Sequence, residues 1–152
     1  MRLKPLHQQT IVITGASSGI GLATARMAAR RGASLVLVSR NVDALAKIAG
    51  EIEAEGGEAI HVAADVAHRD EVQQVAEAAF KRFGGFDTWV NNAGVDLFGK
   101  LEQVSEKDHR RLMDTNFWGV VNGSLVALKH LRGNGGSLIN LGSVESDYAI
   151  PL

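Results

Sequence analysis

Residues 14–21 read TGASSGIG and follow the β-branched run Ile11–Ile13. Glycines at 15 and 19 predict a loop, because Gly15 can take a tight turn and Gly19 has no side chain to block a ligand. Gly21 would let the next helix pack closely against the strand. The first free N–H groups of that helix would then point at an anion. The stretch therefore predicts a site for a nucleotide phosphate between a strand and a helix.

Apolar runs of strand length alternate with helical patterns along the chain. We predict strands at 9–14, 35–38, 59–64, 88–90 and 137–141, and helices at 20–31, 42–55, 70–83 and 105–131. This alternation predicts an α/β fold, a doubly wound, Rossmann-like parallel sheet with helices on both faces. The expected strand order is 3-2-1-4-5, with the C-terminal strands of the complete fold missing. We expect one nucleotide-binding domain over residues 1–152, incomplete at its C-terminal side, with the fifth strand as an open edge.

Helical spacing of apolar residues predicts which face of each helix is buried. For the helix at 42–55 the predicted face is Leu45, Ile48, Ala49 and Ile52. For the helix at 20–31 it is Ile20, Ala23, Thr24, Met27 and Ala28. For the helix at 105–131 it is Leu112, Met113, Asn116, Phe117, Val120, Val121, Ser124, Leu125 and Leu128. Asn116 is thus predicted to lie on a buried stripe.

Composition excludes several classes of function. A net charge of −1 offers no electrostatic basis for binding nucleic acid or an anionic membrane. The absence of cysteine excludes disulfides and thiolate chemistry and suits a reducing cytoplasm. The five histidines lack the spacing of metal ligands, so no metal site is expected. No apolar run reaches transmembrane length, and residues 1–10 lack the apolar segment of a secretory signal. We therefore expect a cytoplasmic protein.

Five motifs stand in a fixed order along the chain. They are TGASSGIG at 14–21, Asp65-Val66, NNAG at 91–94, Asn116 in NFWG and Ser143 in INLGS. A glycine pattern alone would be weak evidence. Together the five motifs resemble the short-chain dehydrogenase/reductase family over essentially the whole chain. The resemblance implies an oxidoreductase that transfers a hydride between a nicotinamide cofactor and a small-molecule carbonyl or secondary alcohol.

The resemblance also implies which residues hold the cofactor. The pyrophosphate would lie on Gly15, Ser17, Ser18, Gly19, Ile20 and Gly21. The alternative for this loop is a glycine turn that only links a strand to a helix. Asp65 would accept a hydrogen bond from the adenine amino group and Val66 would lie against the ring, although a turn or N-cap aspartate is the alternative. The adenosine ribose would lie beside Asn92, Ala93 and Gly94, whereas Asn91 would mainly brace the sheet.

The end of the second predicted strand indicates which cofactor is used. An acidic residue there would accept hydrogen bonds from both ribose hydroxyls and select NAD(H). Ser39 occupies the position of that acid and Arg40 follows it. A guanidinium pairs with a 2′-phosphate through two hydrogen bonds. We therefore expect NADP(H) to be preferred over NAD(H), with a solvated surface arginine as the alternative.

Two candidate catalytic residues follow from the resemblance. Asn116 would disturb its helix, bind a water and complete a proton relay, whereas the alternative is a core amide satisfied by backbone. Ser143 would donate a hydrogen bond to the substrate oxygen and stabilise the charge that develops there during hydride transfer. A serine in a turn is the alternative for Ser143.

One departure from the family pattern concerns the principal acid/base. In the family this is a tyrosine with a lysine four residues on, whose charge lowers the pKa of the phenol. Here the single tyrosine is Tyr148, Leu152 stands four residues later, and Tyr148 follows Ser143 too closely. We therefore predict a cofactor-binding fragment that is inactive alone, from a full-length form that is a homo-oligomer. A non-catalytic nucleotide-binding or interaction module is the alternative.

Overall fold

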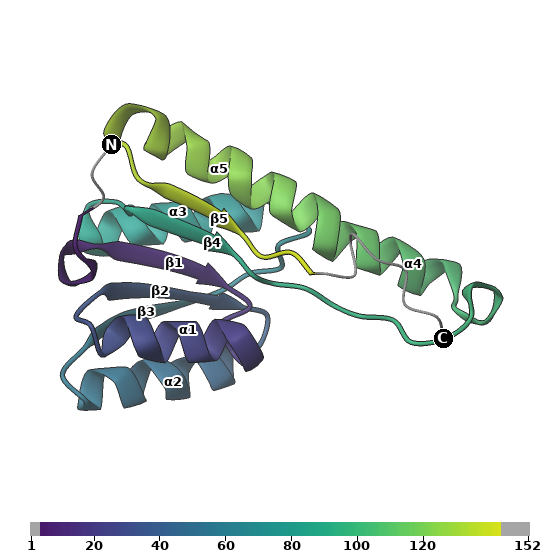
Figure 1. The fold of residues 1–152 in the computed structure, drawn as a ribbon, viewed down its shortest axis with the longest axis horizontal. Coiled ribbons are helices and arrows are strands. Elements are labelled where there is room, and N and C mark those ends of the chain that lie inside the picture. Colours follow the sequence, from purple (N-terminus) through teal and green to yellow (C-terminus); the bar gives the residue numbers. More distant parts are fainter. Residues whose placement is uncertain (1–3, 144–152) are drawn as a thin grey trace.

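The computed structural model describes residues 4–143, in which five strands form one parallel sheet flanked by helices (Figure 1). The elements, in chain order, are η1 (Leu6–Gln8), β1 (Thr10–Thr14), α1 (Gly19–Ala29), β2 (Ser34–Ser39), α2 (Val42–Ala54), β3 (Glu58–Ala63), α3 (Arg69–Phe83), β4 (Thr88–Asn91), η2 (Leu101–Gln103), α4 (Glu106–Met113), a π-helical segment η3 (Asp114–Trp118), α5 (Gly119–Asn134) and β5 (Ser137–Asn140).

The strands follow the order β3-β2-β1-β4-β5, and all four pairings are parallel. The predicted fold class and strand order are therefore confirmed. Within the described residues β5 is an edge strand. Two apolar side chains there are exposed, Ile139 of β5 by 47% and the following Leu141 by 45%. This side of the sheet is thus less covered than its centre.

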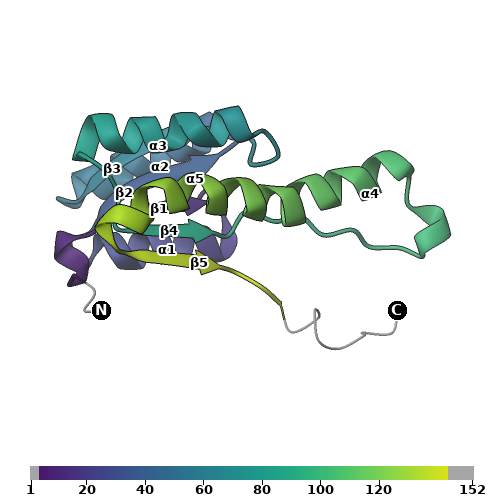
Figure 2. The ribbon, with the colours of Figure 1, turned by 90° about the horizontal axis from the view of Figure 1, so that it is seen from above.

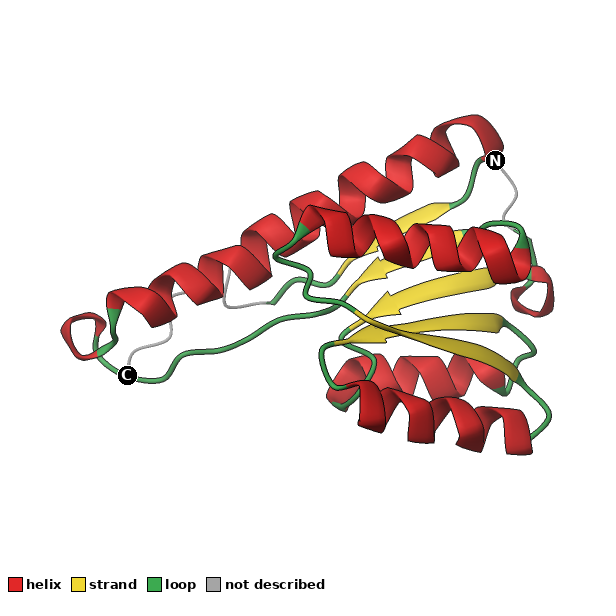
Figure 3. Ribbon diagram, turned by 180° about the vertical axis from the view of Figure 1, so that it is seen from behind, coloured by secondary structure: helices red, strands yellow, loops and turns green. Residues whose placement is uncertain are grey.

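Helices cover both faces of the sheet (Figure 3), and the alternation of side chains along β1 divides the core in two. Ile11 and Ile13 pack in a cluster with residues of α1 and α2. Val12, between them, packs in a second cluster with residues of α3 and α5. The fully buried Trp89 of β4 belongs to that second cluster. A continuous apolar run in the central strands is therefore required, because both faces are covered.

The predicted buried face is confirmed for α2, in which Leu45, Ile48, Ala49 and Ile52 are buried. For α1 it is wrong apart from Ala28, because the buried residues are Gly21, Ala25 and Ala28. The predicted Ile20 and Met27 are 64% and 53% exposed. These three small residues lie at spacings of four and three, on one line along the helix. The two alanines pack in the core cluster with β1 and β2, and Gly21 packs against the loop that follows β1.

The predicted helix at 105–131 is a continuous helical rod from α4 through η3 to α5, and its α4 end extends beyond the sheet (Figure 2). Its predicted buried face is wrong. Met113 and Phe117 are about half exposed, and Asn116 is also exposed. The residues that are buried instead are mostly small or polar, namely Thr115, Gly119, Asn122, Gly123, Val126, Ala127 and Leu131. The rod thus has one face with large apolar side chains and one with smaller side chains. Close approach to β4 favours the face with the smaller side chains.

Candidate functional site

The carboxyl ends of all five strands border one cavity of about 1350 Å³, as expected for ligand sites in open parallel sheets. The cavity brings together nearly all the predicted site residues, namely Gly15, Ser17, Ser18, Gly19, Ile20, Ser39, Arg40, Asp65, Val66, Asn92, Ala93, Gly94, Asn116 and Ser143. Gly21 does not line it. Residues as far apart in the sequence as Gly15 and Ser143 thus meet at one edge of the sheet.

The glycine loop is held by close backbone packing. Gly15 has a φ of +68°, and a Cβ on it would lie 2.8 Å from Ala93 Cα. A Cβ on Gly21 would collide with the Gly15 carbonyl and the Asn92 amide, so Gly21 packs against the loop rather than directly against the strand. Gly19 has a φ of +54°, and no atom lies within 4 Å of where its Cβ would be. The side of the loop at Gly19 is therefore open.

Thr14 and Asn92 clamp the glycine loop to β4. The Thr14 hydroxyl accepts hydrogen bonds from the N–H groups of Asn92 at 2.9 Å and Ala93 at 3.0 Å. Asn92 Nδ2 in turn donates to the carbonyl oxygens of Thr14 at 2.8 Å and Gly15 at 3.3 Å. The Asn92 side chain is thus engaged with the loop, although the residue lines the cavity. The role of Thr14 was not predicted; a buried hydroxyl at the last strand position is the signal that could have indicated it.

Asn91 joins three elements beneath the cavity. Its Oδ1 accepts a hydrogen bond from Trp89 Nε1 at 2.8 Å. Its Nδ2 donates to Asn140 Oδ1 at 2.8 Å and to Ser124 Oγ at 3.2 Å. The residue therefore connects β4 to β5 and α5, which are contacts of a bracing residue.

Ser39 and Arg40 lie where β2 enters the cavity. Ser39 Oγ accepts a hydrogen bond from the Asn41 N–H at 3.1 Å, and Asn41 Oδ1 caps α2 by accepting from the Ala44 N–H at 3.0 Å. Arg40 is exposed and lines the cavity. Across residues 4–143 its guanidinium makes no ion pair. It is available for an anion in the cavity.

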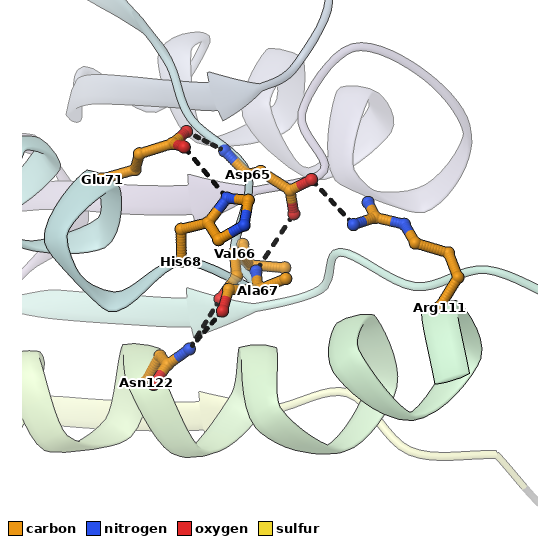
Figure 4. Close-up of polar contacts among 7 residues, drawn as sticks. All are labelled: Asp65, Val66, Ala67, His68, Glu71, Arg111 and Asn122. Atoms are coloured by element: carbon orange, nitrogen blue, oxygen red, sulfur yellow. Dashed lines mark hydrogen bonds and ion pairs between the residues drawn. The ribbon is translucent and has the colours of Figure 1, made fainter. Parts of the chain in front are cut away.

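Asp65 is the centre of a polar cluster at the end of β3 (Figure 4). Its Oδ1 accepts a hydrogen bond from the Ala67 N–H at 3.0 Å, which makes the turn that was one interpretation of this residue. Its Oδ2 accepts from Arg111 Nη1 at 2.7 Å, and its own N–H donates to Glu71 Oε2 at 2.7 Å. The side chains of Asp65 and Arg111 are 17% and 32% exposed.

The electrostatic surroundings keep Asp65 ionised. Burial by itself would raise the pKa of the Asp65 carboxyl, but the hydrogen bonds from Arg111 and the Ala67 N–H, with the charges of Arg111 and Arg40, outweigh it. The pKa of Asp65 is therefore lowered from its ordinary value. Two arginines act on one carboxylate, and the one in direct contact is Arg111.

Val66 forms the wall next to Asp65. The residue is buried, and a Cβ on Gly119 of α5 would lie 2.6 Å from Val66 Cγ2. Asn122 Nδ2 donates to the Val66 carbonyl at 2.9 Å and to the Ala67 carbonyl at 3.2 Å. The close packing and these two bonds hold the end of β3 against α5 and leave Val66 facing the cavity.

Asn116 lies in the π-helical segment η3, so the helix is irregular at this residue as expected. Its Oδ1 accepts from the Val95 N–H at 2.9 Å and its Nδ2 donates to the Val95 carbonyl at 2.8 Å. The side chain is thus satisfied by backbone, but on an exposed residue rather than in the core. Ser143, three residues beyond β5, is exposed and lines the cavity. Tyr148 lies outside the described residues.

Two polar lining residues from the long helical rod were not predicted. Arg111 is one, and its pairing with a residue 46 positions away leaves no signal in sequence spacing. Thr115 is the other. It is 4% exposed, and within residues 4–143 its Oγ1 is buried without a hydrogen-bond partner. Such a hydroxyl fits a polar ligand in the cavity.

None of the helices in residues 4–143 has the length and apolar character needed to cross a bilayer.

Comparison with known proteins gives consistent matches. The sequence pattern of the short chain dehydrogenase family matches residues 9–152. The oxidoreductase YxnA of Bacillus subtilis is 52% identical over 149 residues, which cover 97% of this chain and 42% of YxnA. An oxidoreductase of Methylorubrum extorquens is 42% identical, over 98% of this chain and 60% of its own length. The chain thus spans about half the length of these relatives.

Solved structures agree in fold. An alcohol dehydrogenase from Thermococcus sibiricus, complexed with 5-hydroxy-NADP, superposes with a TM-score of 0.90 at 38% identity, over 94% of this chain and 61% of its own. A short chain dehydrogenase/reductase from Burkholderia phymatum, in complex with NAD, superposes with a TM-score of 0.94 at 34% identity, over 98% of this chain and 54% of its own. Both forms of the dinucleotide therefore occur among similar structures.

Proposed function

Because this chain belongs to the short-chain dehydrogenase family, we propose that it carries the cofactor site of an NADP(H)-dependent oxidoreductase. The whole protein would transfer a hydride between NADP(H) and a carbonyl or secondary alcohol of a small molecule. The observation that carries the choice of cofactor is the pair Ser39-Arg40, on the same cavity as the glycine loop. Similar structures hold either dinucleotide, so the choice rests on this chain's own residues.

The residues present fit such a cofactor. The open side of Gly19 leaves room for a pyrophosphate against backbone N–H groups and the start of α1. Ser18, the N-cap of α1, makes no side-chain capping bond, so its hydroxyl can face a ligand. The buried Thr115 hydroxyl offers a further polar contact in the cavity. When bound, the nicotinamide supplies or accepts the hydride.

Each remaining residue has a proposed task. Asp65 accepts a hydrogen bond from the adenine amino group, and Val66 packs against the ring. Asn92 holds the loop, and Ala93 and Gly94 lie beside the ribose. At the other end of the cavity Ser143 donates a hydrogen bond to the substrate oxygen, where negative charge develops. Asn116 binds a water and completes a proton relay, and its side-chain amide also holds the Val95 backbone.

A titration tests the proposal. We expect the purified 152-residue chain to bind NADPH about 10-fold or more tightly than NADH, because a charge-assisted contact to the 2′-phosphate is worth about 1.5–3 kcal/mol. Arg40→Ala should remove the difference. Arg132→Ala is the matched control, because it removes one exposed arginine of α5 that does not line the cavity. Equal affinity of the unaltered chain for both cofactors would overturn the assignment of NADP(H).

A further inference from the structure

Arg40 and Asp65 are neighbours at the carboxyl edge of the sheet. Strands β2 and β3 pair in parallel, with Ser39 opposite Ala63. The Ala64 N–H donates to the Ser39 carbonyl at 3.0 Å, so the pairing continues up to the residues where both strands enter the cavity. Arg40 and Asp65 therefore lie next to each other on the same cavity wall. A carboxylate in this place can pair with the guanidinium of Arg40 and so compete with an anion bound in the cavity.

Arg111 already occupies that carboxylate. Its Nη1 lies 2.7 Å from Asp65 Oδ2, and it reaches Asp65 from α4 (Figure 4). The other oxygen, Oδ1, is held by the Ala67 N–H at 3.0 Å. Among residues 4–143 Asp65 makes its ion pair with Arg111 and none with Arg40. The charge of Asp65 is therefore neutralised by Arg111 rather than by an ion pair with Arg40.

We infer that Arg111 is a specificity-determining positioning residue, which neutralises and holds Asp65 so that Arg40 stays available for a 2′-phosphate in the cavity. The inference rests on the proposed function, since it concerns the NADP(H) preference assigned to Arg40. Its physical basis is charge balance, because two guanidinium groups face one carboxylate and one positive charge is left over. Arg111 itself need not touch the phosphate.

Removing Arg111 should change cofactor preference rather than cofactor affinity in general. In Arg111→Ala the freed Oδ2 of Asp65 would pair with Arg40, and the 2′-phosphate would meet a carboxylate as well as an occupied guanidinium. We expect the ratio of NADPH to NADH affinity to fall about 10-fold, the value of one charge-assisted contact. If Arg111 only docked α4 against the sheet, its loss would lower the affinity for both cofactors equally and leave the ratio unchanged.

A rescue variant tests whether Arg111 acts through Asp65. In the double variant Asp65→Asn, Arg111→Ala the competing charge is gone, so the NADPH preference should return to within about threefold of the unaltered chain. Arg110→Ala is the matched control, because Arg110 is the neighbouring arginine of α4 and pairs on the surface with Glu106, their side chains being 74% and 78% exposed. This control should keep the original ratio.

Dissociation constants for NADPH and NADH, measured by titration of the purified 152-residue chain and its variants, decide the outcome. An unchanged ratio in Arg111→Ala, or a ratio that Asp65→Asn does not restore, would overturn the inference. If the unaltered chain shows no preference for NADPH, the proposed function itself fails. Should Arg111→Ala not fold, Arg111→Gln replaces it, because glutamine keeps a polar side chain there but removes the positive charge; a ratio within twofold of the original would then count against the inference.

Discussion

Asn116 binds Val95 through both atoms of its side-chain amide, accepting from the N–H at 2.9 Å and donating to the carbonyl at 2.8 Å. The pair ties the π-helical segment to the chain that leaves β4, 21 residues away in sequence. Both residues line the cavity. The asparagine thus fixes one wall of the cavity through backbone geometry.

Replacing Asn116 by alanine should free the chain around Val95. We expect a loss of about 1–2 kcal/mol in the free energy of unfolding, from two hydrogen bonds on an exposed residue, and faster hydrogen exchange at the Val95 N–H. Asn134→Ala is the control, because Asn134 bonds to His130 at the far end of α5 and does not line the cavity. Unchanged exchange at Val95 in Asn116→Ala would contradict this prediction.

Gly19→Ala should reduce NADPH binding without a packing clash. The new Cβ would meet no protein atom within 4 Å, but it would project into the open side of the loop. Gly56→Ala is a matched control, because Gly56 also has a positive φ, +85°, and open surroundings, and it does not line the cavity. Both variants should lose about 1–2 kcal/mol of stability through the left-handed backbone. Only Gly19→Ala should lower the affinity for NADPH measured by titration. An equal loss of affinity in both variants would show that the loop has no special part in binding.

Gly123→Ala should destabilise the fold, because its Cβ would collide with Asn91 Oδ1 and lie 2.9 Å from Trp89 Nε1. The clash would break the bond between these two side chains and push α5 away from β4. We expect a loss of about 2–4 kcal/mol, from overpacking and a lost buried hydrogen bond. Gly133→Ala, in the same helix with nothing within 4 Å, should be neutral or slightly stabilising. Denaturant unfolding of both variants makes the comparison, and similar midpoints would refute it.

The Asp65–Arg111 pair should make stability depend on pH at the acid end. The folded-state pKa of Asp65 lies below its ordinary value of 3.8, so its stabilisation is fully present above pH 3.8 and is lost as the pH falls through the folded pKa. Asp65→Asn should therefore be less stable than the unaltered chain at neutral pH, and the gap should close as the pH falls below 3.8. Urea unfolding across this pH range measures both curves. A gap independent of pH would show that the carboxylate charge contributes nothing.

The 152-residue chain by itself should not reduce ketones with NADPH at a measurable rate. Its one tyrosine has Leu152 four residues later, so these residues contain no tyrosine–lysine pair to exchange a proton with the substrate. NADPH binding should nevertheless be retained. Spectroscopic detection of NADPH oxidation with a panel of ketones is the measurement, and turnover that disappears in Ser143→Ala would show that the chain is catalytic after all.

Much of the fold was predictable because its signals are local. The glycines at 15 and 19, the strand-length apolar runs and the α2 stripe each depend on backbone preference or on spacing within one element. The predicted buried faces of α1 and of the long rod were wrong, because spacing identifies an apolar face but not which of two faces the sheet accepts. Gly123 allows α5 to approach β4 closely, and Gly21 allows α1 to approach the Gly15 carbonyl closely.

The sequence alone therefore determined the order of strands and helices and the position of the glycine loop, since these follow from local conformation and chain connectivity. Only the tertiary structure decided which residues complete the cavity wall. Arg111 lies 46 residues from Asp65, and Asn92 lies 77 residues from the Gly15 carbonyl that it binds. Contacts at such separations depend on how helices pack against the sheet, and that packing is set by side-chain volume on both partners at once.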